Sequence, residues 1–402
     1  MIVWLTGIIV LATIVGIAVG RWPLLRADRA TIALIGSALL MATGSLTLEQ
    51  AFAGLDLPTL LLLFSMMVLN GQLYIAGFFG TVAQRVVQAA RGPRTLLALI
   101  IGASGVLSAL FLNDTIVLML TPLVLDLTRA LRRNPIPYLL GLATAANVGS
   151  MATITGNPQN MIIASASQIT YIDFTMALLA PALIGLVICW GVVMLLYRDE
   201  FRSVTFAVPE VMRGEVSLPL LRKTLVVIPL MLLLFLSGVP VAQAAFLAAA
   251  VMLATRRLEP DRIYKTIDWN LLLFFAGLFV VTHSLEVQGV TDRLFVLLEP
   301  VARAGLIPFG LVAGLLSNLI SNVPAVLVMR GLVPALDDPQ RGWLMLAAAS
   351  TLAGNLTLLG SVANLIVAEL AGRWGVRLHF STYMRAGVPI TVATMLVTFL
   401  MI

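Results

Sequence analysis

Four short polar segments interrupt an otherwise apolar chain of 402 residues, and their side chains are of the kinds that bind ions and polar solutes. Asn-Asp-Thr at 113–115 and Ser-Asn-Val at 321–323 each lie between two apolar runs. Thr-Gly-Asn-Pro-Gln-Asn at 155–160 and Leu-Gly-Ser-Val-Ala-Asn at 359–364 each interrupt one apolar run. Amides and hydroxyls offer neutral donors and acceptors, and carboxylate and carbonyl oxygens are ligands of hard cations. The four segments therefore predict a binding site for an ion and a small polar solute.

The segment at 155–160 is suited to break a membrane helix and to leave both broken ends usable. Gly156 relieves the backbone, and Pro158 cannot continue the preceding helix but can begin a new one. Non-helical backbone is tolerated at membrane depth only where protein or a water-filled cavity surrounds it. The broken ends expose carbonyl and N–H groups whose partial charges can hold a cation and an anion, respectively. The segment at 359–364 has Gly360 and Ser361 but no proline, so we expect a gentler interruption there.

Asp114 is the residue that we expect to bind the coupling cation. A carboxylate at mid-bilayer costs roughly 2.5 to 3.5 kcal/mol on insertion scales, so it is retained only where it faces a cavity or has a partner. Near a hairpin tip, Asp114 could bind sodium or exchange a proton, and it could also cap the outgoing helix. The segment at 321–323 has Val323 where the segment at 113–115 has Asp114, when Asn322 is aligned with Asn113. We therefore expect one strong cation site rather than two.

The other candidates lie at the tips, at the breaks and on the approach to the breaks. Asn147 and Asn355 could contact the site or form helix–helix hydrogen bonds. His283 and Glu286 supply only two ligands at the end of a span, so the only metal site expected is one for a coupling sodium. The expected substrate- and ion-binding residues are Asn113, Asp114, Thr115, Asn147, Thr155, Gly156, Asn157, Pro158, Asn160, Ser321, Asn322, Val323, Asn355, Gly360, Ser361 and Asn364.

The composition indicates that these segments lie in a polytopic membrane protein. The chain is 60% hydrophobic and 11% charged, a balance that excludes an ordinary soluble domain. Its net charge of +6 is spread over one membrane face, so nucleic acid is not an expected partner. The first apolar run lacks a basic region and a cleavage site, which favours a retained first helix. Apolar runs that could cross a bilayer occur at about 2–20, 30–48, 57–79, 137–168, 173–197, 222–237, 239–255, 268–285, 342–371 and 385–402.

Two further segments, 95–128 and 304–334, are apolar on both sides of a polar centre, and we expect each to be a re-entrant hairpin. Cytoplasmic loops retain basic residues, and with two hairpins only Arg293, Arg303, Arg330 and Arg341 fall outside. If each of these two segments instead crossed the membrane twice, the loops would lie on the same sides, so the distribution of charge leaves that alternative open. The bias places the N-terminus outside and the central linker in the cytoplasm.

Three sequence matches, in the same order, relate the first half of the chain to the second. DLPTLLLLF from Asp56 resembles DWNLLLFFA from Asp268, and LNDTIVLMLTPLV from Leu112 resembles SNVPAVLVMRGLV from Ser321. TITGNPQNMIIA from Thr153 resembles TLLGSVANLIVA from Thr357. Ordered matches of this kind indicate an internal duplication.

Each half then has five crossings and one hairpin, so the second copy is inverted relative to the first. Inverted repeats with paired broken helices are typical of secondary transporters whose site lies between the halves. The expected organisation is a first repeat at 1–197 (hairpin 95–128, broken helix 137–168), a cytoplasmic linker at 198–221 and a second repeat at 222–402 (hairpin 304–334, broken helix 342–371).

These motifs resemble the ion transporter superfamily, which includes arsenite efflux pumps, sodium/proton antiporters of the NhaD kind, citrate-metal carriers and divalent-anion/sodium symporters. FLNDTIVLMLTP, NVGSMATITGNPQN, LISNVPAVL and LTLLGSVANLI carry the resemblance, which covers nearly the whole chain and is nearest to bacterial inner-membrane "anion transporter" proteins. In the dicarboxylate branch a Ser-Asn-Thr at each tip binds substrate, and Asp114 and Val323 depart from that pattern. Arsenite pumps carry an Asn-Asp at the first tip, as Asn113 and Asp114 do here.

The resemblance implies an all-α polytopic transporter rather than an enzyme. The first expectation is secondary active transport of a small inorganic or organic anion or oxyanion by alternating access, coupled to sodium or protons. Arsenite or antimonite efflux with proton antiport, sodium/proton antiport and, from a different class, an ion channel are the alternatives. No cofactor is expected, and Na⁺ or H⁺ is the expected coupling ion. The expected setting is the bacterial inner membrane, and the dimeric dicarboxylate relatives imply a homodimer.

Overall fold

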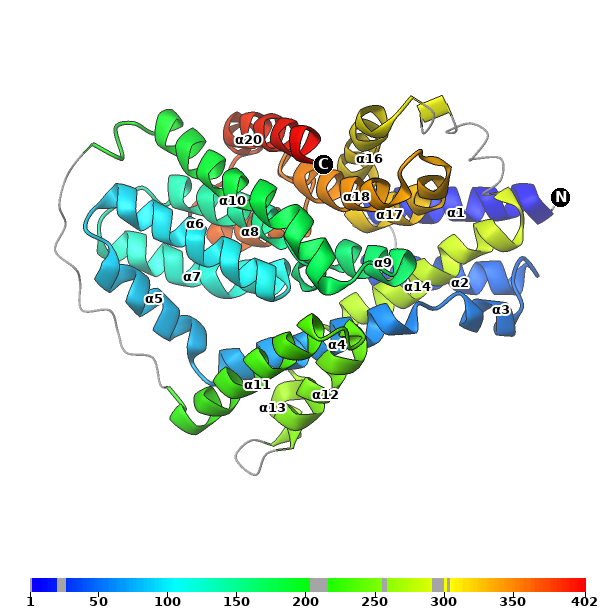
Figure 1. Ribbon diagram of the computed structural model, residues 1–402, viewed down its shortest axis with the longest axis horizontal. Helices are drawn as coiled ribbons and strands as arrows, with labels where there is room; N and C mark the ends of the chain where they lie inside the picture. The colour runs from blue at the N-terminus through cyan, green and yellow to red at the C-terminus, as the bar shows by residue number, and fades with distance from the viewer. Residues whose placement is uncertain (1, 20–26, 203–215, 255–258, 291–299, 302–303) are drawn as a thin grey trace.

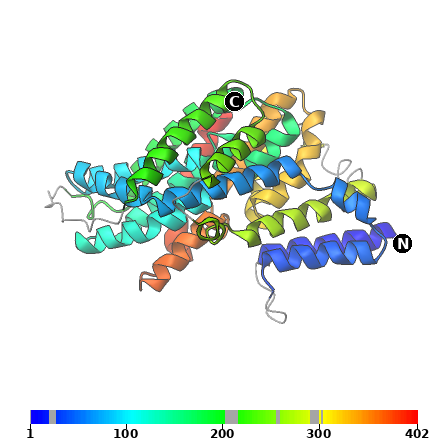
Figure 2. The same cartoon turned by 90° about the horizontal axis from the view of Figure 1, so that it is seen from below.

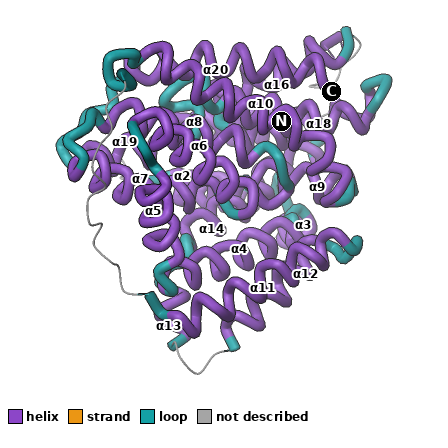
Figure 3. The backbone as a smooth tube through the Cα atoms, turned by 60° about the vertical axis from the view of Figure 1, so that its left-hand side comes forward, coloured by secondary structure: helices purple, strands orange, loops and turns teal. Residues whose placement is uncertain are grey.

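The computed structural model describes residues 2–19, 27–202, 216–254, 259–290, 300–301 and 304–402. Over these ranges the regular structure is helical and contains no strand, as Figure 3 shows. Seven of the described helices are long and apolar enough to cross a membrane. The prediction of an all-α polytopic membrane protein is therefore confirmed. Residues 203–215 of the linker, and also Arg293 and Arg303, lie outside the described residues.

The helices before the linker follow the predicted runs closely. They are α1 (Ile2–Val19), α2 (Arg29–Ala42), α3 (Leu48–Ala53), α4 (Leu57–Ile75), α5 (Phe78–Ala89), α6 (Pro93–Leu110), α7 (Asn113–Ala130), α8 (Pro135–Ser150), the 3-10 turn η1 (Ile154–Gly156), α9 (Pro158–Ser167) and α10 (Tyr171–Leu196).

The described helices after the linker begin at Leu218. They are α11 (Leu218–Leu236), α12 (Val241–Leu253), α13 (Pro260–Tyr264), α14 (Trp269–Val287), α16 (Leu306–Ile320), α17 (Asn322–Met329), the 3-10 segment η2 (Arg330–Ala335), α18 (Pro339–Ala353), α19 (Val362–Arg373) and α20 (Phe380–Met401).

Two differences from the predicted runs have local causes. The run at 30–48 is not one helix, because Gly44 adopts a left-handed φ of 74° and Thr47 with Gln50 forms a capping box that begins α3. The run at 57–79 ends at Gly77, whose φ is 79°. A separate amphipathic helix, α5, follows it and buries Phe79 while Arg85 stays exposed.

The helices pack in two sets, which Figures 1 and 2 show from two directions. In one set α6 packs on α8, α16 on α18, and α10 on α20. In the other set α2 packs on α14 and α4 on α12, with α1 beside α2 and α11 beside α12. In this second set, α2 and α4 come from the half before the linker, and their partners α14 and α12 come from the half after it.

Both predicted hairpins and both predicted breaks coincide with helix ends. Helices α6 and α7 are joined by Phe111 and Leu112, and α16 meets α17 at Ser321. Helix α8 gives way to α9 through η1, whereas α18 and α19 are separated by residues 354–361 without a 3-10 element. The expectation of a gentler second break is wrong, because the second interruption lacks the 3-10 turn of the first and leaves residues 354–361 outside any helix.

Candidate functional site

The first hairpin tip places Asn113 and Asp114 at the start of α7. Phe111 and Leu112 are both 2% exposed and anchor the tip in the core. Asn113 is also buried, and its Nδ2 donates to Asn147 Oδ1 at 3.1 Å. Asp114 lies in the first turn of α7, where the unpaired N–H groups of the helix favour a negative charge.

The second hairpin tip turns at Ser321, whose φ of 79° and ψ of 156° lie in a region that glycine favours. Such a conformation costs on the order of 1–3 kcal/mol and is characteristic of binding sites held by their surroundings. Asn322 is best satisfied with its amide nitrogen facing the Ser350 and Gly360 carbonyls and its oxygen facing Gln159 Nε2, each at 3.2 Å. Asn322 therefore connects the second tip to both breaks.

Two asparagines close the first break. Asn157 caps α9 by accepting from Asn160 N at 2.9 Å, and Pro158 takes the first helical position, where no N–H is needed. The Asn160 Nδ2 donates to the carbonyls of Ser150 at 3.1 Å and Thr153 at 2.8 Å. The amide of Asn160 thus replaces the helical bonds that α8 loses at its end.

The second break is closed in the same way. The Asn364 Nδ2 donates to the carbonyls of Gly354 at 2.7 Å and Thr357 at 3.3 Å. These acceptors stand ten and seven residues before Asn364, as the acceptors of Asn160 stand before it. Both interruptions are therefore built structures with satisfied carbonyls.

Gly156 allows the first break to fold tightly against the end of α8. A Cβ added to Gly156 would lie 2.2 Å from the Ser150 carbonyl oxygen and 2.7 Å from its Cα. Gly360 is similarly close to the Asn318 amide, at 2.4 Å. A side chain at Gly156 would require movement of the break, whereas one at Gly360 would first displace the Asn318 amide.

We expect Gly156→Ala to destabilise the protein by about 2 kcal/mol, because overpacking against backbone has no flexible neighbour to absorb it. Gly102→Ala in α6 is the matched control, since nothing lies within 4 Å of its added Cβ and alanine is the better helix former. Thermal unfolding of the two purified variants measures the difference. Equal melting temperatures would show that the break is not tightly packed.

Asn147 of α8 is the centre of a buried amide network. Its Oδ1 accepts from Asn113 Nδ2 at 3.1 Å and from Ser361 Oγ at 3.0 Å. Its Nδ2 donates to Asn355 Oδ1 at 2.8 Å and to Asn364 Oδ1 at 3.1 Å. One side chain, 1% exposed, thereby links the first tip to the second break. Of the two roles open to Asn147, the structure shows the helix–helix hydrogen bond.

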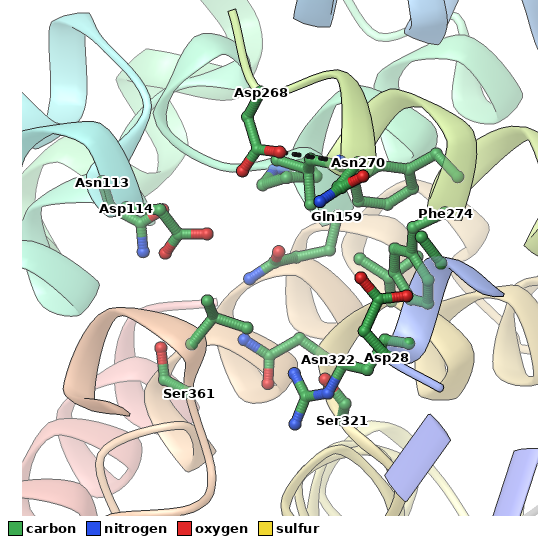
Figure 4. Close-up of a pocket in the computed structure, with 17 residues that line it drawn as sticks. Asp28, Asn113, Asp114, Gln159, Asp268, Asn270, Phe274, Ser321, Asn322 and Ser361 are labelled. Carbon is green, nitrogen blue, oxygen red and sulfur yellow. Dashed lines mark hydrogen bonds between the residues drawn. The ribbon is translucent and has the colours of Figure 1, made fainter. Parts of the chain in front are cut away.

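A cavity of about 280 Å³, here called the chamber, lies where these segments meet. Figure 4 shows Asp114 reaching into it from one side, with Gln159 and Asn322 across from it. Both hairpin tips, both breaks and the first residues of α2 and α14 contribute to its wall. Of the predicted residues, Asn113, Asp114, Pro158, Ser321, Asn322, Val323 and Ser361 line it.

The remaining predicted residues do not line the chamber. Thr115 lines a neighbouring cavity. The others lie outside both linings, in the buried structure of the breaks and of the amide network: Asn147, Thr155, Gly156, Asn157, Asn160, Asn355, Gly360 and Asn364.

Several chamber residues were not predicted from the sequence. Asp28 caps α2 by accepting from Thr31 N at 2.9 Å, and Asp268 caps α14 by accepting from Leu271 N at 3.0 Å. With Arg29, which follows Asp28, they add charge to the chamber wall. The cap signals were readable in the sequence, but a cap does not reveal that its helix begins beside a cavity. The further lining residues are Ala30, Gln159, Asn270, Leu271, Phe274, Phe275 and Val362.

The charged residues of the chamber are unbalanced. Asp28, Asp114 and Asp268 supply three carboxylates, whereas Arg29 is the one basic residue among the described residues of the lining. A cavity of this charge attracts cations and opposes a multivalent anion, for which Arg29 alone among the described lining residues could form a bidentate contact.

His283 and Glu286 lie away from the chamber and form an ion-pair cluster. Glu286 accepts from Arg330 at 2.8 Å and is 3.1 Å from His283 Nδ1. Because Arg330 begins η2, the cluster joins α14 to the end of the second hairpin. The parts of the chain that the structure describes contain no group of three metal-binding side chains. Half-exposed pairs contribute at most about 1 kcal/mol, so this cluster is a weak contact.

Comparison with known proteins relates this arrangement to membrane transporters. A family described as "Citrate transporter" matches residues 8–353. The silicon efflux transporter LSI3 of Oryza sativa is 30% identical over 420 residues, which cover 87% of each chain. An uncharacterized transporter of Mycobacterium tuberculosis is 29% identical over 93% of each chain. A putative transporter of Dictyostelium discoideum, named arsB, is 22% identical over 92% of this chain and 86% of that one.

The fold also resembles a solved structure. The crystal structure of the YdaH transporter of Alcanivorax borkumensis matches with a TM-score of 0.61 and covers 100% of this chain and 96% of that one. The sequences are 15% identical, so the likeness concerns the fold alone.

Proposed function

The chain belongs to the citrate transporter family, and on this premise we propose that it moves a small oxyanion, or its conjugate acid, by alternating access coupled to sodium or protons. The family and the relatives are transporters and not enzymes. The observation that carries the proposal is the chamber, in which two hairpin tips and two helix breaks meet. Broken helices around a shared cavity are the way in which secondary transporters present backbone charge to a substrate and its coupling ion.

Two inverted repeats, 1–197 and 222–402, are part of the proposal. Asn160 and Asn364 close their breaks on carbonyls at the same spacing, which supports the alignment of the two halves. Helix packing supports it as well. In the alignment of the two halves α2 corresponds to α12 and α4 corresponds to α14, and the observed pair α2–α14 therefore corresponds to the observed pair α12–α4. Alternating access then follows from movement of the hairpins and broken helices against α1–α4 and α11–α14.

The charge of the chamber bears on the substrate. Three carboxylates and one guanidinium disfavour a multivalent anion, which would need Arg clamps to replace its hydration. A weak oxyacid that is uncharged at neutral pH avoids this cost and still hydrogen-bonds to the amides and hydroxyls. The hydroxides of arsenic, antimony and silicon have that character. Arsenite or antimonite efflux is therefore favoured over di- or tricarboxylate transport, and sodium/proton antiport is the next alternative.

The kind of membrane, the orientation of the chain and its oligomeric state are also proposed. We place the chain in a bacterial inner membrane with its N-terminus outside and its linker inside, because the basic residues gather on one face. Its exposed apolar side chains, such as Val187 on α10 and Leu233 on α11, would face lipid. Assembly as a homodimer rests on the resemblance to dicarboxylate carriers.

Uptake into proteoliposomes tests the function. We expect saturable movement of arsenite, antimonite or silicic acid that depends on a sodium or proton gradient, with sulfate, phosphate and tricarboxylates moved poorly. Unsaturable flux with single-channel current would indicate a channel. Preferred transport of a tricarboxylate would contradict the argument from charge.

A further inference from the structure

A second cavity, of about 950 Å³ and here called the vestibule, adjoins the chamber. Residues of α4, α5, α7 and α19 line it, together with the segment that leads into α14. Asp114, Pro158, Asp268, Leu271 and Val362 belong to the walls of both cavities. An ion that moves from the vestibule into the chamber therefore passes Asp114 and Asp268.

These two carboxylates face the same space from different helices. Figure 4 shows Asp268 entering from the start of α14 and Asp114 from the start of α7, with both carboxylates turned toward the cavity. Asp268 Oδ1 accepts from Leu271 N, but within the described ranges Asp268 Oδ2 and both Asp114 oxygens have no hydrogen-bond or ion-pair partner. Unpaired carboxylates that share a cavity are an arrangement that a cation completes.

An independent observation points to a ligand in the same place. Asn70 of α4 lines the vestibule, is 1% exposed, and has no partner for either its Oδ1 or its Nδ2. Beside it, Gly71 packs so closely on Thr266 that an added Cβ would lie 2.0 Å from the Thr266 hydroxyl. A buried amide without a partner is uncommon and calls for an occupant of its cavity. Its oxygen and the Thr115 hydroxyl are hard ligands of the kind that a small cation prefers.

We propose that a monovalent cation, sodium or a proton, binds between Asp114 and Asp268, with Asn70 on its vestibule side. This inference rests on the proposed function, in which Asp114 carries the coupling ion, and it adds Asp268 as the second ligand. Among the described residues, the other charged side chains that line the two cavities are those of Asp28, Arg29 and Lys265.

The position of the cation gives coupling a physical cause. Helix α7 packs on α8 and α19, whereas α14 packs on α1, α2 and α4, so the two carboxylates belong to the two packing sets. A bound cation attracts both carboxylates and holds the first hairpin against α14. When the cation leaves, the carboxylates repel one another, and the hairpin is released from α14.

Asp268→Asn tests the site in the full-length protein. We expect it to raise the half-saturating concentration of the coupling ion by about tenfold or more, as loss of one ligand contact does. Asp268→Glu should restore most of the ion affinity, and Asn70→Leu should weaken it. Asp261→Asn, an exposed carboxylate on α13 outside both cavities, is the matched control.

Calorimetry on purified protein separates the two cations. If the ion is sodium, titration of sodium at fixed pH should give binding heat, and Asp268→Asn should reduce that heat. If the ion is a proton, substrate binding should change the number of protons bound to the protein, and Asp268→Asn should reduce that change. A defective Asp114→Asn beside a normal Asp268→Asn overturns the inference and leaves the proposed function standing. A wild-type protein that binds no sodium and exchanges no proton overturns both.

Discussion

Asp114→Asn will reduce ion-coupled transport at least about 100-fold, the size of effect that follows loss of a side chain that exchanges a proton or carries a charge. Asparagine fills nearly the same volume at the start of α7, so the hairpin tip keeps its shape. It cannot balance the charge of a sodium ion, and it cannot take up or release a proton. Counterflow or uptake in proteoliposomes, with and without sodium at several pH values, measures the loss.

Asp126→Asn is the matched control for this result. Asp126 lies on the same helix, is exposed, and lines neither the chamber nor the vestibule. We expect its transport to equal that of the wild-type protein. If Asp114→Asn also transports at the wild-type rate with unchanged ion dependence, the coupling ion binds elsewhere.

Asn147→Leu will destabilise the protein by more than about 4 kcal/mol. Leucine has a similar volume but removes four hydrogen bonds at once. Each buried partner left unsatisfied costs roughly 1–3 kcal/mol, and the loss is shared among groups that satisfy one another. The measurement is thermal or denaturant unfolding in detergent.

Asn70→Leu is the matched comparison for Asn147→Leu. Asn70 and Asn147 are both 1% exposed, but the amide of Asn70 has no partner to lose. Replacing an unpartnered buried amide with an apolar group of the same size is close to neutral, or stabilising. Similar destabilisation by both substitutions would mean that volume, rather than the hydrogen-bond network, decides the stability of this region.

The hairpin tips and the breaks were predictable because their polar residues interrupt apolar runs. A polar segment inside an apolar run cannot face lipid, so Asp114, Asn322 and Gly156 had to lie within the protein or at a cavity. Their meeting in one region follows from that constraint and from the duplicated pattern. The sequence could not decide the role of Asn147, because an amide suits a ligand and a neighbouring helix equally well.

The charged residues at the starts of α2 and α14 were not predictable in the same way. Asp28 and Asp268 lie at the ends of apolar runs, where a cap residue is ordinary and implies no cavity. Only packing shows that both helices begin beside the first hairpin tip. The second break was misjudged because proline was taken as the main cause of unwinding, whereas Asn364 holds that break open by binding two carbonyls.

Accessibility of the chamber from the two sides of the membrane tests the central claim most directly. Val323→Cys places a thiol in the chamber wall without removing a hydrogen-bonding side chain, and the native Cys189 is buried and adds little background. An impermeant thiol reagent, applied to either side of proteoliposomes, should label this cysteine from both sides, and substrate with coupling ion should slow the labelling. Labelling from one side alone, unchanged by substrate or by an ion gradient, would contradict alternating access at this chamber.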